Sequence, residues 1–244
     1  MRFLVVALSS VPDTTTARRL FGLDDLDDKD VSKVLMHRRK QQTGSSEILR
    51  WDQRAIAALT LIRHSVDKVQ IESMNLAAHT EAEMLEAFYK GAMRDGCTVS
   101  WDGQHKVLPL IHFRTLMHEV SYPAYWQALK MGLESHLDVR GWLSTAPEDR
   151  PELDETARKL GFPGMLKHDE DSVVRAWLQN AHAGVQAYSD ITALNTYLLA
   201  SRLFGVKGEM TRHDAGRTLN KLRDELARRD EPHLAEFLSA WTAP

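Results

Sequence analysis

The chain has 244 residues and a formal net charge of −3, with 43% hydrophobic and 27% charged residues. This balance is typical of one large or two small folded domains, and it excludes a disordered, collagen-like or disulfide-rich chain. It also gives no bulk attraction to nucleic acid, so such binding would need a local patch. The single cysteine, Cys97, excludes an internal disulfide and a cysteine-cluster metal site, which favours a reducing, cytoplasmic compartment.

Short apolar runs closed by turn residues predict strands in the first half of the chain. The run at residues 3–8 is followed at once by Ser9 and Ser10, so a buried strand is favoured over a signal peptide. Further strands are predicted at 55–62, 66–74 and 97–101. No apolar run is long enough to cross a membrane, and no membrane partner is expected.

Helices are predicted between and after these strands. The acidic residues between 24 and 30 indicate the start of a helix toward Gln42, because acidic groups favour the first turn. Thr80 and Glu83 have the spacing of a capping box, which predicts a helix through residue 92. Helical spacing then predicts helices at 110–118, 153–160, 172–178 and 185–204, and apolar stripes at 215–226 and 234–241.

Common catalytic signatures are absent from the chain. It contains no dinucleotide-binding glycine motif, no P-loop, no Gly-x-Ser-x-Gly and no His-Glu-x-x-His. The run from His168 to Asp171 has the composition of a metal site, but adjacent residues do not share a helix face, so a solvated loop is predicted. Cys97 has no obvious base nearby, which argues against a catalytic thiol.

Four segments in chain order are similar to one family. They are Val6-Ala7-Leu8-Ser9-Ser10-Val11-Pro12-Asp13; Arg38 to Gly44 with Gln53 to Ala57; Val99-Ser100-Trp101-Asp102-Gly103 with Leu108-Pro109 and His112-Phe113-Arg114; and Ala187-Tyr188 with Leu194 to Leu198. Over about residues 1–205, the chain resembles the predicted bacterial 3′–5′ exonucleases related to the proofreading domain of family B DNA polymerases, within the DEDD group. The resemblance implies an α/β, ribonuclease H-like mixed sheet flanked by helices. A helical C-terminal portion, 206–244, is expected to pack on the same domain.

The resemblance implies four metal-binding carboxylates, and the chain lacks all of them. In the family they are an Asp-x-Glu on the first strand, an Asp after Trp-Asn-Gly, and an Asp four residues after a Tyr. Here these positions align with Ala7, Ser9, Val107 and Thr192. Two divalent metals need several charged oxygen ligands. The sequence therefore predicts a degenerate site without a metal; Mg²⁺ or Mn²⁺ is expected only if the enzyme is active through a rearranged site.

Other acids were considered as substitutes for the missing carboxylates. Asp13 follows the first strand, Asp102 replaces the Asn of the middle motif, and Asp190 precedes Thr192 by two residues. On a helix Asp190 is rotated by about 200° from Thr192, so it is expected to face away. These acids are not expected to assemble a two-metal site.

The residues around the four aligned positions are compatible with three functions. Candidate nucleic-acid contacts are Trp101, Asp102, His105, Lys106, Arg114, Tyr188 and Asn195. The first interpretation is a pseudoenzyme that binds single-stranded DNA or RNA without cleaving it. The second is a protein-interaction or scaffold module, or a self-associating one, with an apolar patch at Leu234, Phe237 and Trp241. The third is an active nuclease with a rearranged site.

Overall fold

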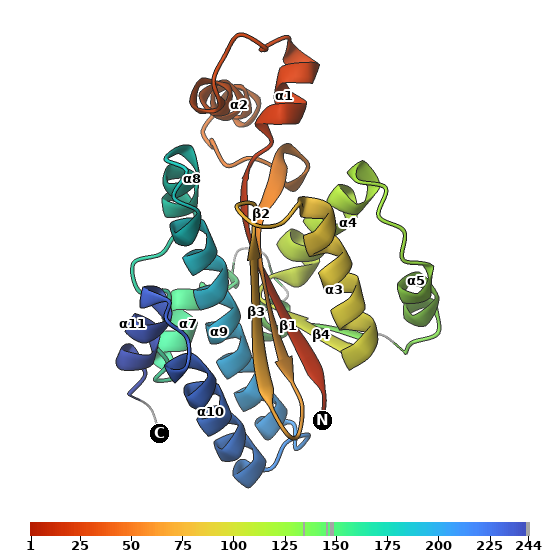
Figure 1. The fold of residues 1–244 in the computed structure, drawn as a ribbon, viewed down its shortest axis with the longest axis vertical. Helices are drawn as coiled ribbons and strands as arrows, with labels where there is room; N and C mark the ends of the chain where they lie inside the picture. The colour runs from red at the N-terminus through yellow and green to blue at the C-terminus, as the bar shows by residue number, and fades with distance from the viewer. Residues whose placement is uncertain (134, 145, 147–148, 243–244) are drawn as a thin grey trace.

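The computed structural model describes residues 1–133, 135–144, 146 and 149–242. At its centre lies a five-stranded sheet with the strand order β3-β2-β1-β4-β5 (Figure 1). Strands β1, β2 and β3 are antiparallel neighbours, whereas β4 and β5 run parallel to β1. The strands are β1 (Phe3–Pro12), β2 (Arg54–His64), β3 (Val69–Asn75), β4 (Cys97–Ser100) and β5 (Ser135–Asp138). The predicted α/β mixed sheet is confirmed, with β5 as an additional short strand.

Helices surround this sheet on both faces. Most predicted helices are present within a few residues of their expected bounds, while the short helices α1, α5 and α6 were not predicted. The helices are α1 (Thr14–Phe21), α2 (Asp28–Thr43), α3 (Glu81–Asp95), α4 (Leu108–Met117), α5 (Pro123–Lys130), α6 (Val139–Leu143), α7 (Leu153–Lys159), α8 (Glu170–Leu178), α9 (His182–Val206), α10 (Arg212–Ala227) and α11 (Pro232–Ala240), with single turns η1 (Trp51–Gln53) and η2 (Gly103–Val107).

Strand β1 is buried on both faces, and its sequence is accordingly a continuous apolar run without alternating polar residues. Phe3, Val5 and Ala7 contribute to the core shared with α9, whereas Leu4 and Val6 contribute to the core shared with α3 and α4. A continuous apolar run is what a central strand covered on both faces requires. This explains why the first strand was visible in the sequence.

The C-terminal helices pack on the same core as the sheet and α9. Leu234 and Phe237 are fully buried there and Trp241 is almost so. The predicted exposed patch at these three residues is therefore wrong. Their spacing indicated an apolar helix face correctly, but the face is covered by the rest of the domain.

Helices α1 and α2 project from one end of the molecule, directly after β1 (Figure 1). They enclose a small core of their own, built from Ala17, Val31, Leu35 and Leu49. The acidic run begins α2 as predicted, with Asp27 as the capping residue. In the part of the chain that the structure describes, no helix is both long and apolar enough to span a membrane.

Candidate functional site

The two first-strand positions that the resemblance aligns with metal-binding carboxylates lie against α9. Ala7 and Ser9 are buried, with 2% and 0% of their surface exposed. The Ser9 hydroxyl donates to the Val185 carbonyl at 2.6 Å, and the Ser189 hydroxyl donates to the Ala7 carbonyl at 3.1 Å. Small side chains on β1 thus let α9 approach the strand through direct hydrogen bonds.

The other two positions lie at the end of η2, directly before α4, and on α9. Val107 ends the turn η2 and packs with Val6 and Leu110 in the core on the α3 face. The Thr192 hydroxyl is half-buried and contacts the sulfur of Met165 at 3.8 Å. Each side chain therefore has a neutral partner within the fold.

These four positions do not fit a pair of divalent cations. Ala7 and Val107 have no side-chain oxygen, and the Ser9 hydroxyl is held by a carbonyl. Hard cations such as Mg²⁺ require charged oxygen ligands. Over the described stretches of the chain, no group of three or more His, Cys, Asp or Glu side chains is placed to hold a metal ion.

A chain of ion pairs begins at Asp102, which follows β4. Asp102 accepts from Arg140 at 2.8 Å and from Arg150 at 3.4 Å, and all three side chains are largely buried. Arg140 also pairs with Glu152 at 2.6 Å, and Arg150 contacts His105. Two arginines thus neutralise Asp102, so its carboxylate is bound within the fold and does not fit the predicted role of a nucleic-acid contact.

The backbone of this motif explains its sequence. Asp102 has a left-handed conformation with φ of 56°, which brings the chain sharply back toward the sheet. A Cβ atom on Gly103 would clash with His136 and with the Ser100 hydroxyl. Glycine at 103 therefore lets the turn that carries His105 and Lys106 pack closely against His136 and Ser100.

A second ion-pair chain begins at Lys106, next to His105, and links η2, α8 and β2. Lys106 from η2 pairs with Glu170 from α8 at 3.0 Å, and Arg54 from β2 pairs with the other oxygen of Glu170 at 3.2 Å. The Arg54 guanidinium also donates to Ser10 at 3.2 Å. The charges of Lys106 and Arg54 hold the pKa of Glu170 below its usual value, although burial alone would raise it.

Glu170 corrects one prediction of the sequence analysis. The run His168–Asp171 is not a solvated loop, because Asp169 caps α8 through the Ser172 amide at 2.6 Å and Glu170 begins that helix. The Asp169–Ser172 capping box was present in the sequence as a signal for a helix start. The partners of Glu170 lie 64 and 116 residues away, so no local pattern revealed them.

The phenol of Tyr188 on α9 is influenced by an acid from each ion-pair chain. Burial raises the pKa of its phenol, and the negative charges of Glu170 and Glu152 raise it further. Trp101 and Tyr188 are both half-buried and pack on the core of the α9 face. Lys106 pairs with Glu170 and His105 contacts Arg150, so two of the predicted site residues take part in these ion-pair chains. The joint role of Trp101, His105, Lys106 and Tyr188 in one site stays a prediction.

Two other candidate binding residues lie within internal networks. Arg114 has 6% of its side chain exposed and pairs with Asp13 and Glu81. Asn195 is fully buried and bonds through its amide to the backbone of Gly164 at 2.8 and 3.1 Å. The polar groups of both side chains are bonded inside the protein, so neither fits the predicted role of a ligand contact.

Asp13 and Asp190, the other acids near the aligned positions, are also bound by partners within the fold. Asp13 caps α1 through the Thr16 amide at 2.9 Å and pairs with Arg114. Asp190 is 1% exposed and accepts from Thr60 and Ser73 at 2.7 Å, on the strands β2 and β3. Its second oxygen contacts His233 at 2.8 Å. Asp190 is therefore bound to the sheet and to α11.

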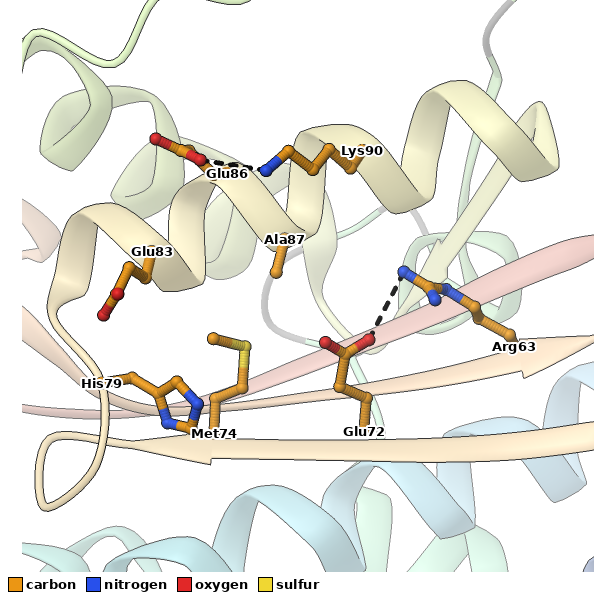
Figure 2. Close-up of a pocket in the computed structure, with 8 residues that line it drawn as sticks. All are labelled: Arg63, Glu72, Met74, His79, Glu83, Glu86, Ala87 and Lys90. Atoms are coloured by element: carbon orange, nitrogen blue, oxygen red, sulfur yellow. Dashed lines mark hydrogen bonds and ion pairs between the residues drawn. The ribbon is translucent and has the colours of Figure 1, made fainter.

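An open groove of about 420 Å³ lies apart from these residues, between α3 and the strands β2 and β3 (Figure 2). Four of its charged side chains pair with one another: Arg63 with Glu72 at 3.4 Å, and Lys90 with Glu86 at 3.0 Å. None of the predicted site residues lines this groove. The ion pairs around Tyr188 remain the candidate functional site.

A five-stranded mixed sheet with the long helix α9 packed against β1 makes this an α/β protein. A family model described as a predicted 3′–5′ exonuclease related to the exonuclease domain of PolB matches residues 46–241. The chain belongs to this family, as the sequence resemblance indicated. The matched range includes Val107 and Thr192 and begins after β1. No curated protein matches the chain.

Proposed function

We propose that the protein is a catalytically degenerate member of this family that binds single-stranded nucleic acid without cleaving it. The observation that carries the proposal is the neutral, packed state of Ala7, Ser9, Val107 and Thr192. Phosphodiester hydrolysis builds negative charge that this class of enzyme offsets with metals. These four positions supply no carboxylate for that purpose.

The lack of carboxylates at these four positions favours binding of a phosphate near them. Four carboxylates would repel a nucleic-acid backbone unless metals neutralised them, and their absence removes that repulsion. Lys106 has 58% of its side chain exposed, and His105 beside it is exposed as well. Cationic side chains bind phosphates, and the half-buried rings of Trp101 and Tyr188 offer surfaces on which bases stack.

A fluorescence titration with a labelled oligothymidylate tests this proposal. Binding should weaken between about 50 and about 200 mM salt, with a slope near −0.7 for each phosphate contact. The bound strand should stay at full length with Mg²⁺ or Mn²⁺ present. Absence of binding at the lower salt concentration, or shortening of the strand, would contradict the proposal.

A protein-interaction module is the alternative, and one surface favours it. Leu20, Ile48 and Trp51 are 64%, 70% and 42% exposed around the projecting helices α1 and α2. Exposed apolar groups of this kind are typical of interfaces. Sedimentation of the protein over a range of concentrations tests self-association, and a Leu20→Ser/Ile48→Ser variant should then be monomeric.

An active enzyme with a relocated site is the remaining alternative. It would depend on Asp102 or Asp190, which the structure places in ion pairs and buried hydrogen bonds. Shortening of a strand by the unmodified protein, and not by an Asp102→Asn/Asp190→Asn variant, would establish it. The proposal also includes a cytoplasmic location, in keeping with a single cysteine.

A further inference from the structure

We propose that Arg54 and Lys106 form a binding site for one phosphate of the nucleic-acid strand, and that the carboxylate of Glu170 occupies this site when no ligand is bound. The inference rests on the proposed function, because it takes a single strand as the ligand. It adds the residues that bind the phosphate and an internal competitor for them.

The donors of Arg54 and Lys106 point at one carboxylate, as they would in a binding site for an anion. One oxygen of Glu170 accepts from the Lys106 ammonium at 3.0 Å, and the other accepts from both terminal nitrogens of Arg54 at 3.2 Å. Ser10 accepts from the same guanidinium at 3.2 Å, which fixes it at the end of β1. Two elements far apart in sequence, β2 and η2, thus direct their donors at a single carboxylate on α8.

A phosphodiester has the chemistry to replace this carboxylate. It carries one negative charge and two non-bridging oxygens, so it accepts from an arginine and a lysine in the same way. Two cations against one carboxylate leave an excess of positive charge at the site.

The site is accessible to a ligand from solvent. The side chains of Arg54, Glu170 and Lys106 are 21%, 40% and 58% exposed. Ion pairs at such exposure contribute little to stability, so a strand can exchange for Glu170 at small cost. The pairing therefore lowers the affinity for nucleic acid without locking the site.

The test compares Glu170→Gln with a matched control, Glu72→Gln. Glu72 is 43% exposed and pairs with Arg63 in the groove of Figure 2, so its replacement changes net charge equally at another place. Glu170→Gln should bind the labelled oligothymidylate about fivefold more tightly than the unmodified protein, and with a steeper salt dependence. Glu72→Gln should bind unchanged.

Arg54 and Lys106 are tested in the same background. Adding Arg54→Ala and Lys106→Ala to Glu170→Gln should abolish the gain in affinity, with thermal unfolding used to verify that each variant is folded. If the unmodified protein binds and Glu170→Gln binds equally or more weakly, the inference is wrong while the proposed function stands. A gain that persists without Arg54 and Lys106 also overturns it. If neither the unmodified protein nor Glu170→Gln binds, both proposals fail.

Discussion

Replacement of Arg114 by methionine distinguishes a structural cation from a ligand contact. Arg114 on α4 donates to both oxygens of Glu81 at the start of α3 and to Asp13 at the end of β1. Asp13 and Glu81 are 6% and 7% exposed. Methionine keeps much of the side-chain length and removes the charge, so two buried carboxylates lose their cation.

The expected loss of stability is large. Breaking a buried ion pair by removing one partner costs about 3–5 kcal/mol, because a charge is left without compensation. Glu81 keeps its contacts with the Ile56 amide and with His118, both at 2.7 Å, so the lower end of this range applies. A loss of about 3 kcal/mol in a domain of this size lowers the melting temperature by about 6–12 °C.

The loss should depend on pH. Burial alone would raise the pKa of Asp13, but hydrogen bonds from Thr16 and the charge of Arg114 hold it below its usual value. Such a carboxylate stabilises the fold above the pKa it has in the unfolded chain, and this contribution is lost as the pH falls through its folded pKa. The difference between the unmodified protein and Arg114→Met should therefore be largest near neutral pH and should shrink below about pH 4.

Urea unfolding followed by tryptophan fluorescence measures these effects. Lys106→Ala is the control, since its partly exposed ion pair should contribute less than about 1 kcal/mol. The folded Arg114→Met protein should bind oligonucleotide as well as the unmodified protein does. A change in stability below about 1 kcal/mol, or loss of binding with the fold intact, would refute the structural role of Arg114.

Three further outcomes are expected. Burial and nearby positive charges lower the pKa of His64 to about 4. As the pH falls, the unfolded chain therefore takes up this proton before the folded protein does, and the free energy of unfolding should fall by up to about 3 kcal/mol between about pH 6.5 and pH 4. Urea titrations of a His64→Gln variant should lack this fall, and a fall of the same size in the variant would contradict the role given to His64. Lys106→Ala should reduce the salt slope of oligonucleotide binding by about 0.7, and an unchanged slope would exclude a phosphate contact. Asn195→Ala should destabilise the protein by about 1–3 kcal/mol in thermal unfolding without altering binding, since buried backbone groups of Gly164 lose their partners; weaker binding by a folded variant would show that Asn195 contacts the strand.

The parts of the fold that depend on local pattern were predictable from the sequence. Strand β1 is a continuous apolar run, and α3 begins at the capping box formed by Thr80 and Glu83, which the structure confirms. Helix α1 was not predicted, because it contains few apolar residues and packs only against the small core with α2. Strand β5 is short and only partly buried, so its pattern was weak.

The candidate site was predictable only in outline. The family motifs predict that Lys106 and Tyr188 share one site, but the state of each charged group depends on partners far along the chain. Arg114 meets Asp13 from 101 residues away, and Arg54 meets Glu170 from 116. No local spacing predicts which cation is neutralised inside the fold and which faces solvent.

A paired gel assay tests the central claim most directly. A 5′-labelled single strand is incubated with the protein and Mn²⁺, and each sample is divided between a native and a denaturing gel. We predict a shifted band on the native gel and a strand of full length on the denaturing gel. A ladder of shorter products made by the unmodified protein, and not by Asp102→Asn/Asp190→Asn, would contradict a protein that binds without cleaving. An unshifted native band would contradict nucleic-acid binding itself.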